Sequence, residues 1–243
     1  MEKQLYTITE NALVATDTYR LVLSGSGKVD GEFVHLEIPG FYLRRPLSVC
    51  DVSEGRFMLL YKTVGAGTRE LAKLPSGTQL SVLKGLGKGF EADACRHSAL
   101  LAGGGLGAAP LYLLAKKLKE QGKEVTAVLG FNRADEIVLE EEFRALCDHF
   151  ALATLDGSAG VKGFVTDAIA QMDGVDYDYF YTCGPMIMMK VVCQALEGPG
   201  EASLEERMGC GAGFCYGCSI QTRSGIRRVC KDGPVFKKEE ILW

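Results

Sequence analysis

The stretch LLAGGGLGAAPLYLLAKKL, residues Leu100–Leu118, changes from strand-like to helix-like within a few residues. It opens with apolar residues, as in a buried strand, and four glycines follow within residues 103–107. Pro110 stands near the start of the next apolar segment, where its missing N–H costs a helix little. The stretch therefore predicts a βα unit with a glycine turn, and the N–H groups of such a turn at a helix N-terminus can bind phosphate.

Strands and helices continue to alternate on the C-terminal side of this unit. EVTAVLGF (124–131), ALATLDGS (151–158) and YDYFYTCG (177–184) are typical of buried strands. Between and after them, residues 136–150, 164–172 and 186–196 have the apolar spacing of helices. Alternation of this kind predicts a parallel sheet with helical crossovers.

The N-terminal part of the chain has a different period. Up to about residue 93, short strand-like segments such as YRLVLSG (19–25) and RFMLLYKTV (56–64) are separated by turn residues. Short strands at this spacing predict an antiparallel barrel or sandwich.

The composition limits the classes of function. Of 243 residues, 47% are apolar and 24% charged, which is typical of a globular protein with a real core. The formal charge of −4, with no basic stripe, argues against a nucleic-acid partner. No run of 18 apolar residues predicts a membrane span, and we expect a cytoplasmic protein. Its nine cysteines are then expected to be reduced, so that a cluster of them indicates a metal site.

Such a cluster occurs in RMGCGAGFCYGCSIQT, residues 207–222. Cys210, Cys215 and Cys218 have C-x4-C-x2-C spacing, and Cys230 follows beyond a short predicted hairpin. This is the ligand order of plant-type [2Fe–2S] proteins. The glycines suit it because a loop around a cluster must turn tightly and direct N–H groups at sulfur. A structural zinc site is the alternative, although zinc ribbons usually have two C-x-x-C pairs.

Three further motifs suggest nucleotide cofactors, each with an ordinary structural alternative. LRRPLSVCD (43–51) offers arginine, which suits a diphosphate, but a surface arginine is equally common. YKTVGAGTREL (61–71) has a Gly-x-Gly-Thr turn, which also occurs in simple hairpins. TCGPMIMM (182–189) places Cys183 at the carboxyl end of a strand, where ligands of parallel sheets bind, although a core cysteine explains it too. The strand at 124–131 is followed by Asn132 and Arg133 rather than by the usual ribose-binding carboxylate.

In this order, RRPLS, GAGT, GGGLGAAPL and CGPMIMM resemble the ferredoxin–NADP reductase superfamily. RMGCGAGFCYGCSIQT with RVCKDGPVF resembles the electron transfer subunits of NAD-dependent dihydroorotate dehydrogenases, and the resemblance covers nearly the whole chain. It implies an α+β multidomain protein: an FAD-binding β-barrel (1–95), an NAD-binding α/β domain with a parallel sheet (96–200) and a [2Fe–2S] module (201–243).

The resemblance also implies site residues. The family's FAD contacts correspond here to Arg45, Pro46, Leu47, Ser48, Leu60, Tyr61, Lys62, Gly67 and Thr68. Its nicotinamide-nucleotide site corresponds to Gly103, Gly104, Gly105, Gly107, Cys183, Gly184 and Pro185. The cluster ligands would be Cys210, Cys215, Cys218 and Cys230. Leu47 departs from most of the superfamily, which has an aromatic residue there that stacks on the flavin.

The implied activity is an electron relay in pyrimidine (UMP) biosynthesis. An FMN-containing catalytic subunit would oxidise dihydroorotate, and the electrons would pass through [2Fe–2S] and FAD to NAD+. Ser48 is expected near the flavin and Cys183 near the nicotinamide, both as catalytic residues. The resemblance implies a heterotetramer with two copies of each subunit.

Two other functions stay open. One is the flavin subunit of an NADH-dependent ferredoxin:NADP oxidoreductase or sulfide dehydrogenase, a relative that has an aspartate at the position of Cys210. The other is a zinc-stabilised nucleotide sensor without enzymatic activity.

Overall fold

The computed structural model describes residues 1–26, 29, 33–172 and 174–243. Its backbone contacts divide the chain into two compact units: residues 1–89 with 205–234, and residues 90–204 with 235–243. Within the described residues, no helix combines the length and apolar character needed to cross a membrane.

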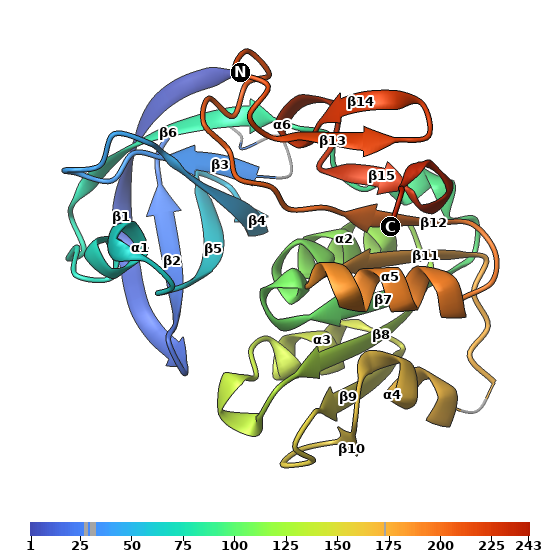
Figure 1. The fold of residues 1–243 in the computed structure, drawn as a ribbon. Coiled ribbons are helices and arrows are strands. Elements are labelled where there is room, and N and C mark those ends of the chain that lie inside the picture. The colour runs from blue at the N-terminus through green and yellow to red at the C-terminus, as the bar shows by residue number, and fades with distance from the viewer. Residues whose placement is uncertain (27–28, 30–32, 173) are drawn as a thin grey trace. The chain divides into compact units, whose positions relative to one another are not determined.

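The first unit contains a closed antiparallel barrel, which confirms the predicted N-terminal barrel (Figure 1). Around the barrel the strand order is β1-β2-β5-β4-β3-β6. The strands are β1 (Glu2–Ala15), β2 (Thr18–Ser24), β3 (Phe33–Leu36), β4 (Arg45–Ser53), β5 (Arg56–Lys62) and β6 (Gln79–Leu86), with helix α1 (Ala66–Leu71) between β5 and β6.

Alternate side chains along these strands point inward and fill the interior of the barrel. Leu21 on β2 lies opposite Leu59 on β5, and both are completely buried. Leu36 on β3 pairs with Val82 on β6, and these two side chains are completely buried as well. Because successive side chains of a strand point to opposite faces, these pairs define the interior face of the barrel.

The same unit includes the C-terminal cysteine-rich segment. It begins as an irregular loop and continues as a hairpin of β13 (Ser219–Thr222) and β14 (Gly225–Arg228), followed by the short helix α6 (Val229–Asp232). The hairpin predicted between Cys218 and Cys230 is therefore present.

The second unit is a seven-stranded sheet in the order β10-β9-β8-β7-β11-β12-β15. All neighbouring strands are parallel except β12 and β15. The strands are β7 (Ser98–Gly104), β8 (Glu124–Phe131), β9 (His149–Thr154), β10 (Val161–Lys162), β11 (Tyr179–Cys183), β12 (Gly200–Ser203) and β15 (Val235–Lys237). The predicted parallel sheet is confirmed.

Helices cover both faces of this sheet, α2 and α3 on one and α4 and α5 on the other (Figure 1). The helices are α2 (Ala108–Glu120), α3 (Glu140–Leu146), α4 (Val165–Gln171) and α5 (Met186–Ala195), and the short 3-10 helices are η1 (Ala92–Ala94), η2 (Gly105–Gly107), η3 (Ala134–Glu136) and η4 (Lys238–Glu240). Burial on both faces explains why the strands read as nearly continuous apolar runs, with Leu100, Leu101 and Phe180 completely buried.

The pairing of the last two strands of the sheet, β12 and β15, was not evident from the sequence. Residues 200–203 and 235–237, on either side of the cysteine-rich segment, pair as antiparallel strands at the edge of the α/β sheet. The sequence-based division places most of these residues in the cluster module instead. Their pairing depends on a contact across more than thirty residues, which local pattern does not reveal.

Candidate functional site

The hairpin of the C-terminal segment brings its last two cysteines, Cys218 and Cys230, together. Cys218 directly precedes β13 and Cys230 lies in α6, just after β14. The N–H of Val229 donates to the carbonyl oxygen of Cys218 over 3.0 Å. The N–H of Cys230 donates to the sulfur of Cys218 over 3.4 Å. The hairpin thus places the last two thiols side by side.

Backbone N–H groups converge on the first thiol. The sulfur of Cys210 accepts hydrogen bonds from the N–H groups of Ala212 (3.4 Å), Phe214 (3.2 Å) and Cys215 (3.4 Å). Burial opposes ionisation of Cys210, but these three N–H groups and the Cys215 thiol outweigh it and lower the pKa of Cys210 to about 6. The loop is therefore built to hold a thiolate at this position.

The thiols interact as two pairs. The Cys210 thiol has a side-chain hydrogen bond with Cys215, and the Cys230 thiol has one with Cys218. Burial, followed by the interaction with Cys218, raises the pKa of Cys230 to about 12. In the described part of the chain, no group of three or more His, Cys, Asp or Glu side chains is placed to hold a single metal ion. The two thiol pairs match the ligand arrangement of a dinuclear centre, in which each iron takes two cysteines.

Positive φ angles shape the loop, as the glycines suggest. Gly211 has φ +65° and Gly213 has φ +84°, a region that glycine enters without strain. Tyr216 has φ +58°, which is unusual for a residue with a side chain. Tyr216 was not predicted from the sequence as a residue of this site.

Arg228 links the loop to the hairpin and was also missed. Its guanidinium donates to the carbonyl oxygen of Gly213 over 2.9 Å and forms an ion pair with Asp232 at 3.0 Å. It also lies over the Tyr216 ring, 4.9 Å from the ring centroid. The sequence does show an arginine four residues before an aspartate, a spacing that suggests their ion pair. This spacing does not reveal that Arg228 also contacts the loop at Gly213.

Part of the loop faces solvent in the described structure. Cys215 is exposed, and the flanking Phe214 and Tyr216 have exposed fractions of 74% and 61%. Two exposed aromatic side chains beside a cysteine of the cluster form an apolar patch of the kind found at protein interfaces.

On the barrel, the two arginines of RRPLS have different environments. Arg44 donates to Glu37 and to the Ser81 carbonyl oxygen (2.8 Å), so it connects strands of the barrel. Arg45 lies over the Phe41 ring, 5.2 Å from the ring centroid, and donates to the Leu43 carbonyl oxygen.

Arg45 also reaches the second FAD motif. A Cβ added at Gly67 would lie 2.7 Å from both Nε and Nη2 of Arg45. Gly67 must therefore lack a side chain for the guanidinium to pack against the first turn of α1. The structure thus brings together Arg45 and the GAGT turn, two motifs that lie about twenty residues apart in the sequence.

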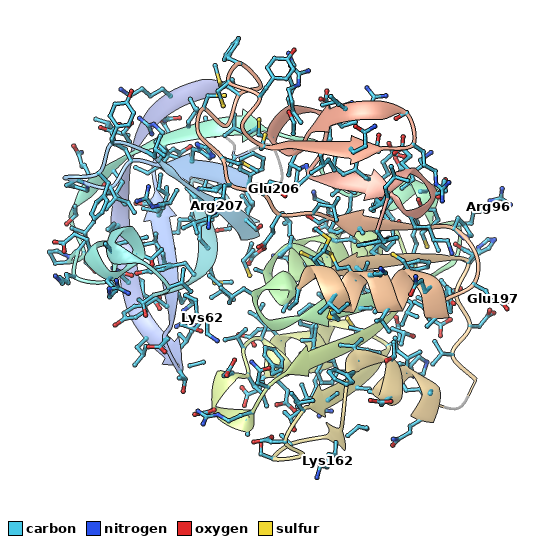
Figure 2. The ribbon with its side chains drawn as sticks, in the orientation of Figure 1. Lys62, Arg96, Lys162, Glu197, Glu206 and Arg207 are labelled. Carbon is cyan, nitrogen blue, oxygen red and sulfur yellow. The ribbon has the colours of Figure 1, made fainter. Side chains whose placement is uncertain are left out.

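Four further residues of the predicted FAD site lie in β5 and α1. Thr68 closes its own turn: its Oγ1 accepts from the N–H of Gly65 and donates to the carbonyl oxygen of Gly65, each at 3.1 Å. Leu60 and Tyr61 are buried, and the Tyr61 hydroxyl donates to Asn11 over 2.8 Å. Lys62, at the end of β5, is labelled in Figure 2.

Pro46, Leu47 and Ser48 lie on β4, and each is half-buried. Leu47 pairs with Val34 and Ser48 pairs with Phe33. Because they are consecutive in a strand, the side chains of Leu47 and Ser48 point to opposite faces. A single flat ligand beside β4 would therefore contact one of these side chains more closely than the other.

In the second unit, the two predicted nucleotide turns lie next to each other. β7 pairs in parallel with β11, with Gly103 opposite Cys183, so that the turns after both strands meet at one edge of the sheet. From β7 the chain proceeds to β8 on one side, whereas β11 lies on the other. This is the topological switch point, where ligands of open α/β sheets bind.

The glycines of these turns allow close contact between the two backbones. A Cβ on Gly107 would collide with the carbonyl group of Cys183 and lie 2.7 Å from the nitrogen of Gly184. A Cβ on Gly104 would lie 3.0 Å from Cδ of Pro185. Gly105 is different, because it has open space around it and a φ of +52°. Cys183 itself is buried, with an exposed fraction of 3%.

The residues after β8 are engaged with their own neighbours. Arg133 forms an ion pair with Asp135 at 2.6 Å, and Nδ2 of Asn132 donates to Glu136 over 3.1 Å. The guanidinium of Arg133 is thus already partly neutralised by a carboxylate.

Comparison with known proteins places these features in one family. Residues 205–242 match the iron–sulfur cluster binding domain of dihydroorotate dehydrogenase B, and residues 101–194 match an oxidoreductase NAD-binding domain. A solved structure described as the NADH-dependent reduced ferredoxin-NADP oxidoreductase has a TM-score of 0.89 and 33% identity, covering 99% of this chain and 90% of its own.

Two curated relatives carry the same name, "Dihydroorotate dehydrogenase B (NAD(+)), electron transfer subunit". The protein from Fusobacterium nucleatum is 36% identical, covering 97% of this chain and 96% of the relative. That from Bacillus cereus (strain Q1) is 40% identical, covering 100% and 99%. The chain therefore belongs to the family of dihydroorotate dehydrogenase B (NAD+) electron transfer subunits.

Proposed function

We propose that this protein transfers electrons to NAD+ by way of a [2Fe–2S] cluster and FAD. The electrons would come from a partner subunit that contains FMN and oxidises dihydroorotate. The observation that carries the proposal is the pairing of four thiols in a loop that belongs to the same compact unit as the barrel. In such a chain the cluster supplies one-electron transfer, the flavin exchanges single electrons for pairs, and NAD+ accepts hydride.

Cys210, Cys215, Cys218 and Cys230 are the proposed ligands of the cluster. The N–H groups directed at Cys210 would stabilise negative charge on the cluster without the cost of a buried counter-ion. The exposed aromatic residues Phe214 and Tyr216 are the proposed contact with the FMN subunit, because electron transfer requires the cluster to be close to its donor. We propose a heterotetramer of two subunits of each kind.

On the barrel, Arg45 and the turn at Gly67 are proposed to hold the FAD diphosphate. Their proximity supports this assignment, since a planar guanidinium pairs well with phosphate oxygens. Pro46, Leu47, Leu60, Tyr61, Lys62 and Thr68 are proposed to shape the rest of the site. Ser48 is proposed to hydrogen-bond the flavin ring and orient it for hydride transfer.

In the second unit, the paired turns are proposed to bind NAD+. The N–H groups after Gly103 would hold the diphosphate, and Cys183 would adjoin the nicotinamide. The ion pair between Arg133 and Asp135 supports NAD over NADP, because a 2′-phosphate would have to compete with a carboxylate for the guanidinium. Gly104, Gly105, Gly184 and Pro185 complete the proposed site.

A pair of cysteine variants tests the relay. Cys215→Ser should lose iron and acid-labile sulfide, and with them dihydroorotate-dependent reduction of NAD+ in the complex with the partner. It should keep FAD and NADH-dependent dye reduction, which need only the flavin and nucleotide sites. Cys147→Ser is the matched control, because Cys147 is partly exposed and lies outside the segment. A Cys215→Ser protein with full iron content and full relay activity would contradict the proposal.

The similarity to the NADH-dependent reduced ferredoxin-NADP oxidoreductase favours one second candidate, the corresponding flavin subunit. Growth without pyrimidines separates the two functions. Deletion of the gene should create a pyrimidine requirement if the protein serves dihydroorotate oxidation, whereas growth without pyrimidines would favour the second candidate.

A further inference from the structure

His35 is a buried polar residue on the outer face of the barrel. Its neighbour in β3, Leu36, pairs with Val82 in the barrel interior, so the His35 side chain points to the opposite face. Its exposed fraction is nevertheless 0%. Something outside the barrel therefore covers the imidazole.

The cover is the cysteine-rich loop. A Cβ built on Gly211 would lie 2.6 Å from Nδ1 and 2.7 Å from Nε2 of His35. The edge of the ring that carries both nitrogens thus packs directly against the backbone of residue 211, immediately after Cys210. Glycine is required there both for its φ of +65° and for the close approach of the imidazole.

Neither ring nitrogen of His35 has a hydrogen-bond partner among the described residues. At least one of them carries a hydrogen, and burying a donor without an acceptor destabilises the folded state. Of its described neighbours, Phe33 contributes a ring at 5.7 Å, and Arg44 uses its guanidinium to donate to the carbonyl oxygens of His35 and Ser81. A buried polar group without a partner calls for one that binds beside it, and a group held by the adjoining loop of metal-binding type would supply it.

We propose that His35 donates an N–H hydrogen bond to a sulfur of the iron–sulfur centre held by the cysteines, and thereby raises the reduction potential of that centre. The proposal rests on the proposed function. Reduction adds one negative charge to the cluster, so a donor to sulfur stabilises the reduced state more than the oxidised state. The hydrogen bond would add a cluster-dependent link to the packing of His35 against the loop.

Three proteins test this role: wild type, His35→Leu and His35→Gln. Leucine removes both nitrogens, whereas glutamine keeps an N–H donor near the position of Nε2. Each is purified as the full chain with FAD, and its iron and sulfide contents are measured before its redox titration. For His35→Leu we expect about a tenfold loss in the equilibrium constant for cluster reduction, which is ~59 mV for one electron. His35→Gln should recover most of this loss.

Labelling with 15N-histidine gives a second readout that needs no variant. The chain has three histidines, and the other two, His97 and His149, lie in the second unit. Pulsed EPR of the reduced cluster should show coupling to 15N in the wild type and lose it in His35→Leu. Phe33→Leu changes the packing of the same face without removing an N–H donor, and should keep the coupling.

Several results would overturn the proposal. These are an unchanged potential in an iron-replete His35→Leu protein, the absence of 15N coupling in the wild type, or a change confined to the flavin. If His35→Leu does not retain its cluster, the wild-type coupling and the His35→Gln potential decide the question. Wild-type protein without iron and sulfide would instead refute the proposed function, and this inference with it.

Discussion

Replacement of Gly107 by alanine should weaken NAD+ binding without abolishing the fold. The φ and ψ of Gly107 are −60° and −16°, which any residue adopts easily. Only space forbids a side chain: the new methyl group would collide with the Cys183 carbonyl group and lie 2.7 Å from the Gly184 nitrogen. Both are backbone atoms, so the turn after β7 and the turn after β11 must move apart.

The size of the effect follows from this contact. Overpacking of one methyl group typically costs about 1–3 kcal/mol. If the displaced turns must return to their native separation to bind the nucleotide, the free energy of binding falls by the cost of this overpacking. We take the middle of the range, about 2 kcal/mol. Since about 1.4 kcal/mol corresponds to a factor of ten, a cost of about 2 kcal/mol corresponds to roughly a thirtyfold rise in the Kd for NAD+.

Gly122→Ala is the matched control. Gly122 has a φ of +74° and nothing within 4 Å of an added Cβ, and it lies beyond the end of α2, away from both turns. Its alanine variant should lose about 1–2 kcal/mol of stability through backbone strain alone. Calorimetric titration of each oxidised, FAD-loaded protein with NAD+, together with thermal unfolding, separates the two effects. If Gly107→Ala binds NAD+ as tightly as Gly122→Ala does, the close approach of the two turns has no role in nucleotide binding.

Three other perturbations have defined outcomes. Ser48→Ala should slow NADH-dependent dye reduction about tenfold or more while FAD stays bound, because one hydrogen bond to the reacting ring is lost; an unchanged stopped-flow rate removes Ser48 from the mechanism. Burial raises the pKa of Asp178, but three backbone N–H groups at residues 96–98 outweigh it and hold that pKa below 3.8. Its stabilisation is therefore present above the ordinary pKa of an aspartate and is lost as the pH falls through the lower folded pKa. Because solvent screens this largely exposed carboxylate, urea unfolding of Asp178→Asn should show a deficit of about 1 kcal/mol or less at pH 7, and the deficit should narrow below about pH 4. Phe214→Ser should weaken association with the partner subunit in gel filtration and leave the iron content unchanged; undiminished association would place the interface elsewhere.

Local patterns in the sequence were sufficient for much of the fold. The apolar run and glycines at residues 100–107 predicted the first βα unit, because strand period and turn chemistry are encoded by neighbouring residues. The spacing of Cys210, Cys215 and Cys218 predicted a metal-binding loop for the same reason. Parallel pairing then followed from the alternation of strands and helices.

Contacts between distant segments could not be predicted in this way. Nothing in the residues around His35 indicates that a loop near residue 211 covers it. The glycines at 104 and 107 suggested phosphate binding, whereas the structure shows that they are also needed for contact with the turn after β11. In each case tertiary packing determines which segment is in contact, and the local sequence does not show this.

The pairing of β12 with β15 has a consequence for the construction of the chain. Ser203 and Val235 are opposite each other in this antiparallel pair, so their Cα atoms are only about 5 Å apart. Residues 204–234 are thus a cassette inserted at the tip of a β-hairpin, and a turn of a few residues should close the gap that its excision leaves. The shortened chain would keep the strands of the barrel and of the α/β sheet but would lack the four proposed cluster ligands, and a foreign cassette with similarly close ends could be grafted in its place.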